Sequence, residues 1–318
     1  MRKGKLIIGS RGSELALWQT NFVKEKLEEF FPETKLEVKI IKTTGDKMLD
    51  VALAKIGDKG LFTRQIETAL LNREIDLAVH SLKDLQTVQP AGLTIGAVSA
   101  RELPNDVLIS KKYASIDDLP KNAKVATGSL RRRSQLLHYR PDLEIFEIRG
   151  NVPTRIKKFE ESDFDAMILA FAGIHRLKLD SYIKQIIPFE IMIPAVSQGV
   201  MGIEIRSDDA EIKELLQKLN DENTSFCVAA ERSFLRTLEG GCQVPIGANA
   251  FLENDKIHLE GMVGNLFGSV NLRDSISGDK KDAADLGKRL AEKLIEKGAN
   301  RLLEATRETV EHTEEAVI

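Results

Sequence analysis

One of the two cysteines in this 318-residue chain, Cys242, stands in the turn-forming stretch "LEGGCQVPIG". A cysteine packs as a small hydrophobe, attacks a substrate as a nucleophile, or carries a covalently attached group. The glycines before Cys242 and the proline after it indicate an irregular, accessible turn, which disfavours packing. No histidine stands out as a base for hydrolysis, and Cys227 is too far along the chain for a redox pair and lies in an apolar helical stretch, where packing is favoured. Covalent attachment of a group is the interpretation that remains for Cys242.

A carboxylate, Asp84, ends the apolar segment "AVHSLKD". An exposed salt bridge with Lys83 and a helix N-cap are two ordinary explanations for an aspartate in this position. Asp84 also lies at the end of a strand, which is where several basic loops of this chain lie. A cationic intermediate bound at such a position would need a negative counter-charge, which Asp84 could supply.

Four loops share one pattern, in which a strand is followed by Ser, Gly, Arg or Lys and then by the start of a helix. They are "GSRGS" (9–13), "HSLKD" (80–84), "TGSLRRR" (127–133) and "RGNVPTR" (149–155). Ligands of open parallel sheets bind at the carboxyl ends of strands, helix N-termini attract anions, and arginine grips a carboxylate through two hydrogen bonds. Each loop alone is also an ordinary helix cap or a solvated face, but together they predict a ligand with many carboxylates or phosphates. No Walker A or G-x-G-x-x-G motif is present, so carboxylates are favoured.

The elements that position these loops follow from the hydrophobic pattern. Apolar strand-like segments alternate with stretches of helical periodicity over the first two hundred residues, the strands being "KLIIGS", "LEVKII", "IDLAVHS", "LTIGAVSA", "DVLIS", "KVATGS", "LEIFEIR" and the start of "FDAMILAFAGI". Strands alternating with helices predict parallel sheets covered by helices on both faces. The irregular stretch 43–60 is long enough to be functional or mobile.

The pattern changes from about Asn223. A helix, "TSFCVAAERSFLRTL", leads to the cysteine turn, and "GANAFLENDKIHLEGMVG" is typical of a hairpin. A third strand, "SVNLRDSISG", and an amphipathic helix, "AADLGKRLAEKLIEKGA", follow. This order predicts a small α+β domain.

Composition narrows the class of protein. Hydrophobic residues make up 42% and charged residues 30%, and the length fits two or three domains of a soluble globular protein. The net charge of -3 supplies no global field for nucleic acid or an anionic membrane, and no window is typical of a membrane span. Two cysteines favour a reducing cytoplasm, and the five scattered histidines disfavour a metal site.

Five motifs, taken in order, resemble the porphobilinogen deaminase (hydroxymethylbilane synthase) family. They are "GSRGSELALWQ", "AVHSLKD", "GSLRRRSQL", "RGNVPTR" and "LEGGCQVPIG", and the resemblance runs from about Leu6 to beyond residue 300. It implies two α/β domains hinged like periplasmic binding proteins, and a C-terminal α+β domain that carries the cysteine. The implied ranges are 1–99 with 200–217, 100–199 and 218–318. The segment "AVSQGVMGIEIR" would return the chain to the first domain.

The resemblance also implies an activity. Four porphobilinogen molecules are joined head to tail with loss of ammonia, and water releases linear hydroxymethylbilane. A dipyrromethane cofactor, attached to Cys242 by a thioether, primes the growing chain. The resemblance further implies a cytoplasmic enzyme, which we expect to be monomeric and to bind neither nucleic acid nor membrane.

The site residues that the resemblance implies fall into four groups. Asp84 matches the catalytic aspartate, which would stabilise positive charge on a methylene-pyrrole. Cys242, Lys83, Ser129, Arg131 and Arg132 match cofactor-binding positions. Arg11, Ser13, Arg149, Arg155 and Arg176 match substrate-binding positions, and Lys55 and Lys59 match a mobile lid. Four positions depart from the commoner pattern, namely Glu14, Gln86, Gly128 and Pro153.

Two other classes of protein compete with the enzyme. A non-catalytic binding protein of the same hinged architecture would take a polycarboxylate, but it needs no thiol, so Cys242 discriminates against it. A nucleic-acid binder would use the three arginines 131–133, and the net charge and the lack of aromatic platforms disfavour it.

Overall fold

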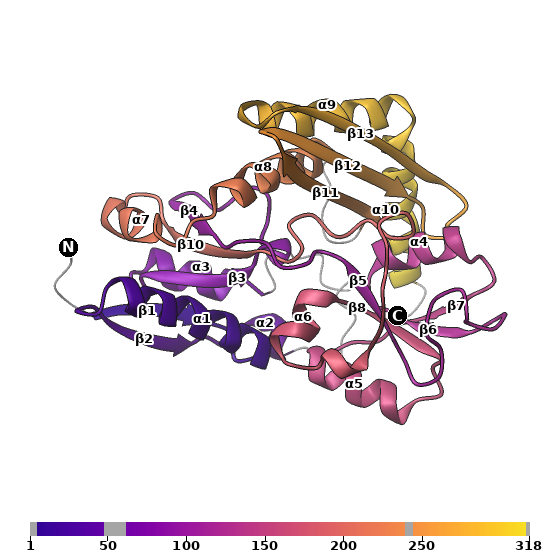
Figure 1. Cartoon of the computed structure of the whole chain (residues 1–318), viewed down its shortest axis with the longest axis horizontal. Coiled ribbons are helices and arrows are strands. Elements are labelled where there is room, and N and C mark those ends of the chain that lie inside the picture. Colours follow the sequence, from indigo (N-terminus) through magenta and orange to yellow (C-terminus); the bar gives the residue numbers. More distant parts are fainter. Residues whose placement is uncertain (1–4, 48–61, 239–243, 316–318) are drawn as a thin grey trace. The chain divides into compact units, whose positions relative to one another are not determined.

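The computed structural model describes residues 5–47, 62–238 and 244–315 (Figure 1). Residues 5–47, 62–102 and 199–225 form one compact unit, here called unit 1, and residues 103–198, 226–238 and 244–315 form unit 2. The domain ranges implied by the sequence remain a prediction. Within the described ranges, no helix is both long enough and apolar enough to cross a membrane.

Unit 1 is built on a five-stranded sheet. Its strands, in spatial order, are β2 (Lys35–Ile40), β1 (Lys5–Ser10), β3 (Leu77–Ser81), β10 (Met201–Arg206) and β4 (Leu93–Val98). Its helices are α1 (Glu14–Phe30), α2 (Thr44–Lys47), α3 (Arg64–Leu71), the 3-10 helix η2 (Leu82–Asp84) and α7 (Ala210–Leu216). Apolar side chains of α1 and α7 pack on one face of this sheet, and those of α3 pack on the other. The predicted covering of both faces is therefore confirmed.

Unit 2 contains a second sheet of similar topology. Its strands, in spatial order, are β7 (Glu144–Phe146), β6 (Lys124–Ala126), β8 (Ala166–Ala170), β5 (Asp106–Ser110) and β9 (Ile183–Ile186). Its helices are α4 (Leu130–Tyr139), α5 (Val152–Glu161), α6 (Phe171–Arg176) and the 3-10 helix η3 (Asp180–Tyr182). Side chains of α4 join the core on one face, and those of α5 and α6 join the core on the other.

The prediction of parallel sheets is wrong for one strand in each sheet. The strands β2, β1 and β3 are parallel, as are β7, β6 and β8. However, β10 is antiparallel to both β3 and β4, and β5 is antiparallel to both β8 and β9. Strand direction depends on the side from which the chain enters the sheet, and the alternation of hydrophobic segments does not record that side.

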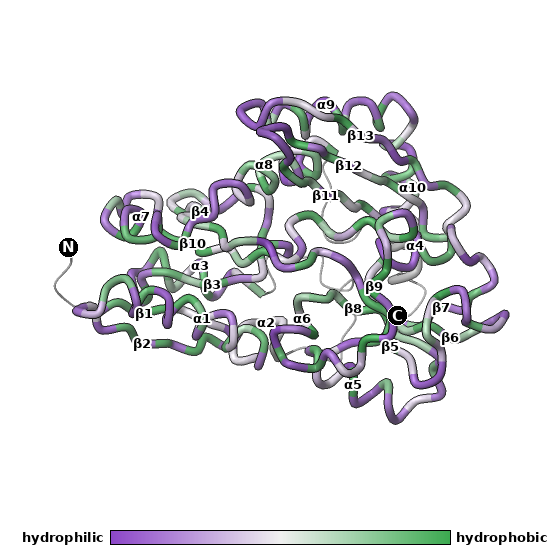
Figure 2. The backbone as a smooth tube through the Cα atoms, viewed as in Figure 1, coloured by the Kyte–Doolittle hydropathy of each residue, from purple (hydrophilic) through white to green (hydrophobic). Residues whose placement is uncertain are grey.

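The remaining part of unit 2 is a three-stranded antiparallel sheet with helices, as predicted. It comprises α8 (Glu222–Thr237), whose first residues belong to unit 1, followed by β11 (Ile246–Glu253), β12 (Lys256–Gly264), β13 (Asn271–Asp279), η4 (Lys280–Asp282), α9 (Ala283–Glu296) and α10 (Ala299–Glu315). In Figure 2, α9 alternates between hydrophobic and hydrophilic residues, and its Leu286, Leu290 and Leu294 join the core. Cys227 is buried in the same core, which agrees with a packing role.

Three of the predicted binding loops start helices through side-chain caps. The side chains of Ser13, Ser129 and Asn151 accept hydrogen bonds from backbone N–H groups three residues on, at 3.4, 3.4 and 2.9 Å. Each cap satisfies one N–H group and leaves others of the first turn directed out of the helix end. Pro153 lies in the first turn of α5, where its missing N–H group removes no helical hydrogen bond.

Candidate active site

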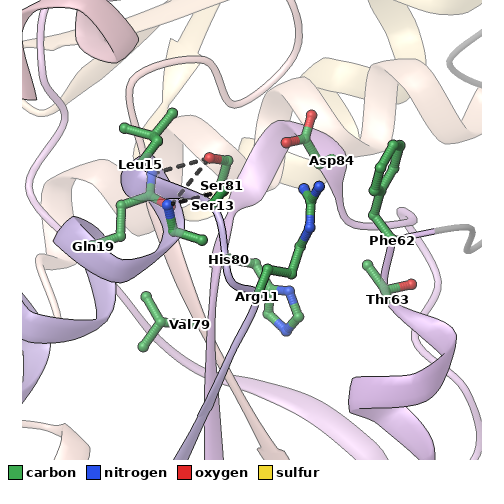
Figure 3. Close-up of a pocket in the computed structure, with 11 residues that line it drawn as sticks. Arg11, Ser13, Leu15, Gln19, Phe62, Thr63, Val79, His80, Ser81 and Asp84 are labelled. Carbon is green, nitrogen blue, oxygen red and sulfur yellow. Dashed lines mark hydrogen bonds between the residues drawn. The ribbon is translucent and has the colours of Figure 1, made fainter. Parts of the chain in front are cut away.

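Unit 1 contains an open pocket that includes three of the predicted site residues (Figure 3). The side chains around it are Arg11, Ser13, Leu15, Ala16, Gln19, Phe62, Thr63, Val79, His80, Ser81 and Asp84. Strands β1 and β3 are parallel neighbours, so the loops after them meet at the same edge of the sheet. The first loop carries Arg11 and Ser13, and the second carries Ser81 and Asp84. The sheet topology therefore explains why residues 70 positions apart share one pocket.

An aromatic ring orients the cation of this pocket. The guanidinium carbon of Arg11 lies 4.2 Å from the centre of the Phe62 ring, and Figure 3 shows the guanidinium on the side of the pocket where Phe62 and Asp84 lie. When the flat face of a guanidinium lies over an aromatic ring, its N–H groups, which lie in the guanidinium plane, point away from the ring edge and stay available as donors. Arg11 is thus suited to grip a carboxylate through two hydrogen bonds.

Asp84 is an exposed carboxylate at the end of η2. It does not cap a helix start, because η2 ends at this residue and the N–H group of Leu85 closes the turn on the Leu82 carbonyl at 3.2 Å. Among the described side chains no ion pair involves Asp84, so its charge is not taken up by the half-buried Lys83. Asp84 can therefore face a positively charged group in the pocket.

A neutral polar pair also lines the pocket, and the sequence analysis missed it. The amide Nε2 of Gln19 donates to the Ser81 hydroxyl at 3.0 Å, and that hydroxyl lies 3.3 Å from Oε1 of the same glutamine. The sequence contains a signal for this pair. Gln19 lies about two helical turns after the Ser13 cap of α1, and Ser81 is the last residue of β3. The other missed lining residues include Phe62, Thr63 and His80.

Two predicted cofactor-binding arginines in unit 2 are buried and paired with one carboxylate. Arg131 and Arg132 are 5% and 6% exposed, and both contact the fully buried Asp106. Nη1 of Arg131 donates to Asp106 at 2.8 Å and to the Ile193 carbonyl at 2.6 Å. Nη2 and Nε of Arg132 donate to Asp106 at 2.8 and 3.1 Å, and its Nη1 donates to the Ile168 carbonyl at 3.1 Å. As expected from helix geometry, not all three consecutive arginines point the same way, because Nε of Arg133 donates instead to the Leu266 carbonyl.

The antiparallel strand β5 explains this pairing. It begins with Asp106 opposite Ala170, the last residue of β8, so an acidic residue lies at the edge where the parallel strands end. Burial opposes ionisation of Asp106, but the two guanidinium groups outweigh burial and hold its pKa well below the usual range for an aspartate.

The other predicted arginines of unit 2 differ in their surroundings. Arg149 pairs with Glu147, and its buried Nε has no hydrogen-bond partner in the described chain. Nε of Arg155 donates to the Gly150 carbonyl at 2.7 Å, where a φ of 124° suits glycine. Arg176 is buried at the end of α6. An orphaned guanidinium N–H group, next to a capped helix start, fits a ligand that brings carboxylates.

Three predicted site residues cannot be placed in this way. Cys242, Lys55 and Lys59 lie outside the described residues, so attachment at Cys242 and the two lid lysines remain predictions. The other predicted residues fall into two sets, one in each unit. All of them except Arg176, which ends α6, lie in the loops and first helical turns that follow parallel strands.

The stability of unit 1 is expected to depend on the ionisation of Glu67. This glutamate of α3 is 6% exposed, and burial raises its pKa, with the Thr63 hydroxyl opposing part of the effect and Glu204 adding to it. A raised pKa means that the folded protein favours the neutral carboxyl of Glu67. The resulting contribution to stability is present below the unfolded pKa of about 4.3, and it is lost as the pH rises through the pKa of Glu67 in the folded protein.

We therefore expect Glu67→Gln to be more stable than the wild type at pH 8 and equal to it near pH 4. Urea unfolding of both proteins across this range measures the difference. The exposed Glu74→Gln is the matched control, since Lys39 lowers the pKa of Glu74 and the sign of its pH dependence is reversed. A stability difference for Glu67→Gln that does not grow with pH contradicts the prediction.

Comparison with solved structures gives only distant similarity. A putative methionine-binding lipoprotein from Bacillus subtilis is 15% identical, with a TM-score of 0.43 over 69% of this chain and 91% of that one. A nutrient-binding protein from Burkholderia cenocepacia bound to methionine is 14% identical, with a TM-score of 0.43 over 72% of this chain and 94% of that one.

Comparison with protein families and curated relatives is decisive. Residues 6–214 match the family described as "Porphobilinogen deaminase, dipyromethane cofactor binding domain", and residues 225–296 match "Porphobilinogen deaminase, C-terminal domain". The porphobilinogen deaminase of Chloroherpeton thalassium is 53% identical over 95% of this chain and 97% of its own length. That of Chlorobium phaeobacteroides is 51% identical over 96% of this chain and 99% of its own length. The chain therefore belongs to the porphobilinogen deaminase family.

Proposed function

We propose that this protein joins four porphobilinogen molecules head to tail, with loss of ammonia at each step, and releases hydroxymethylbilane for tetrapyrrole synthesis. The observation that carries the proposal is the pocket of unit 1. It combines the oriented guanidinium of Arg11 with Asp84, a carboxylate that forms no ion pair with the described side chains. Family membership favours this enzyme over a non-catalytic polycarboxylate-binding protein. The protein acts as a cytoplasmic monomer, without nucleic acid or membrane.

The chemistry of the substrate matches the charges of the pocket. Porphobilinogen carries an acetate and a propionate, which Arg11 and Ser13 bind through charge-assisted hydrogen bonds. Departure of ammonia leaves a methylene-pyrrole whose positive charge is shared with the ring nitrogen. Asp84 is fixed beside the pyrrole N–H group and stabilises this charge where it develops. The family resemblance assigns Lys55 and Lys59, which lie outside the described residues, to a lid.

The residues of unit 2 provide further carboxylate-binding groups. Arg149, Arg155 and Arg176 bind the carboxylates of substrate pyrroles. The buried Nε of Arg149, which has no hydrogen-bond partner among the described residues, supports this role. Ser129, Arg131 and Arg132 bind carboxylates of the dipyrromethane. Lys83 is assigned to the same cofactor by the family resemblance. Asp106 holds two of these guanidinium groups rigid, so they lose little entropy when an anion binds. When bound, the cofactor supplies the free pyrrole end to which the first porphobilinogen is joined.

The covalent cofactor gives the most direct test. The purified wild-type protein is expected to be heavier than its sequence by one dipyrromethane, and Cys242→Ser is expected to lack the increment and the activity. Intact mass spectrometry after expression in cells that make porphobilinogen measures both. Cys227→Ala is the control and should keep the increment, because Cys227 packs in a core. A wild-type mass equal to the sequence mass, or an adduct on Cys227, overturns the assignment.

A further inference from the structure

Three ionisable side chains are buried behind the pocket of unit 1. His80 of β3 is 6% exposed, Glu204 of β10 is 0% exposed, and Glu67 of α3 is 6% exposed. Glu204 pairs across the sheet with Ala78, which packs against α3, and His80 lies two positions after Ala78. Side chains two apart on a strand, and those directly opposite on a neighbouring strand, point to the same face. His80 and Glu204 therefore lie on the face that α3 covers, and His80 also reaches the pocket.

Glu204 has one close partner. Its Oε2 lies 3.2 Å from Nε2 of His80, while neither carboxylate oxygen accepts a hydrogen bond from the described residues. A fully buried carboxylate without a hydrogen bond or a counter-charge is strongly unfavourable. His80 is therefore the side chain placed to supply a counter-charge to Glu204 across the sheet.

The surrounding charges are consistent with this arrangement. Burial raises the pKa of Glu67, which favours the neutral form of this second carboxyl. The other ionisable groups on the neighbouring elements include the buried Arg206 of β10, which pairs with Asp76 and Asp209. They also include Arg64 of α3, which interacts with Glu67, and Arg11 and Asp84 in the pocket. No group of three or more His, Cys, Asp and Glu side chains in the described ranges is arranged to hold a metal ion.

The pair joins the two strands that hold the catalytic turn. The N–H group of Leu82 donates to the Val200 carbonyl at 2.9 Å, just before β10, and Leu82 is buried against Gly202. A Cβ atom on Gly202 would lie 2.7 Å from Leu82, so the two segments are in close contact there. The contact between His80 and Glu204 is a second connection between the same two strands. His80 lies on β3, four residues before Asp84 in the sequence.

We propose that the buried ion pair between His80 and Glu204 makes His80 a positioning residue, which holds the turn carrying Ser81 and Asp84 in the geometry that the reaction needs. This inference rests on the proposed function for the reaction and extends it to residues outside the substrate contacts. Loss of the pair leaves the Asp84 side chain present but less well placed. Displacement of a catalytic group by about 1 Å can lower a rate on the order of a hundred-fold.

The test compares Glu204→Gln with the wild type by nitrogen-15 NMR of labelled histidine. The chain contains only five histidines, so the ring signals are few, and His80→Gln assigns that of His80. At pH 7.5 we expect His80 of the wild type to show protons on both ring nitrogens, and that of Glu204→Gln to show one. A neutral His80 ring in the wild type, or the same ring state in both proteins, overturns the ion pair.

The kinetic readout separates positioning from general loss of stability. For Glu204→Gln loaded with cofactor, we expect kcat to fall at least about tenfold with KM nearly unchanged. The matched control is Glu231→Gln in unit 2, where the fully buried Glu231 accepts the N–H groups of Ser197 and Ala250 at 2.7 Å each. This control should lower the melting temperature but leave the His80 signal and kcat as in the wild type. An unchanged kcat in Glu204→Gln, or an equal fall in the control, refutes the positioning role.

The two inferences can fail separately. The NMR result needs no turnover, so a doubly protonated His80 ring in a protein that consumes no porphobilinogen supports the ion pair and contradicts the proposed function. A wild-type protein that consumes porphobilinogen but has a neutral His80 ring supports the proposed function and contradicts the ion pair.

Discussion

Asp84→Asn is expected to slow porphobilinogen consumption by about a hundred- to a thousand-fold, equivalent to about 2.7–4 kcal/mol of transition-state stabilisation. The amide keeps the size of the side chain but removes the charge, and its NH₂ group presents positive hydrogens to a developing cation. The folded protein should survive the change, since Asp84 is exposed and makes no ion pair in the described chain. The measurement is single-turnover consumption by protein already loaded with cofactor.

Asp84→Glu is expected to fall between the wild type and the Asn variant. It keeps the charge but moves it by about one methylene, and a displacement of about 1 Å can lower a rate on the order of a hundred-fold. Asp208→Asn is the matched control, because Asp208 is an exposed carboxylate of unit 1 that pairs with Arg73 at 2.9 Å. Such surface pairs contribute about 0–1 kcal/mol, and this control should keep full activity. An Asp84→Asn variant within a few-fold of wild type removes Asp84 from the mechanism.

The second large effect is on stability, at Asp106. Asp106→Asn is expected to lower the free energy of unfolding of unit 2 by about 3–5 kcal/mol, because it leaves two buried guanidinium groups without their counter-charge. An asparagine oxygen still accepts one or two hydrogen bonds but supplies no negative charge to Arg131 or Arg132. Chemical denaturation at pH 7 measures the loss. Asp163→Asn, which breaks the exposed pair with Lys124, should change stability by less than about 1 kcal/mol.

The pH dependence of this effect has a definite sign. The pKa of Asp106 is lowered in the folded protein, so its contribution to stability is present above the unfolded value of about 3.9 and is lost as the pH falls toward the folded value. The difference between the wild type and Asp106→Asn should therefore be greatest at neutral pH and smaller near pH 3. A difference that is constant with pH, or below about 1 kcal/mol at pH 7, contradicts the assigned charge pairing.

Local features of the sequence determined much of this protein. Hydrophobic spacing predicted α4, the hairpin of β11 and β12, and α9, because burial on one side of a helix or strand imposes a period that can be read in the residues. Likewise, the Ser, Gly and Arg composition of the loops indicated anion-binding helix starts, and three of these starts have the expected kind of cap. The motifs also identified the family, and with it the expectation for Cys242.

Only the tertiary structure decided which distant residues meet. Asp106 reaches Arg131 and Arg132, and Glu204 reaches His80, because β5 and β10 each enter a sheet antiparallel to their neighbours. Strand direction and strand order depend on how the whole chain packs around its cores, and neither leaves a periodic signal in the residues of the strand itself. For the same reason, the short strand β9 was not predicted, because none of its four residues is buried and its pairing partner lies more than 70 residues away.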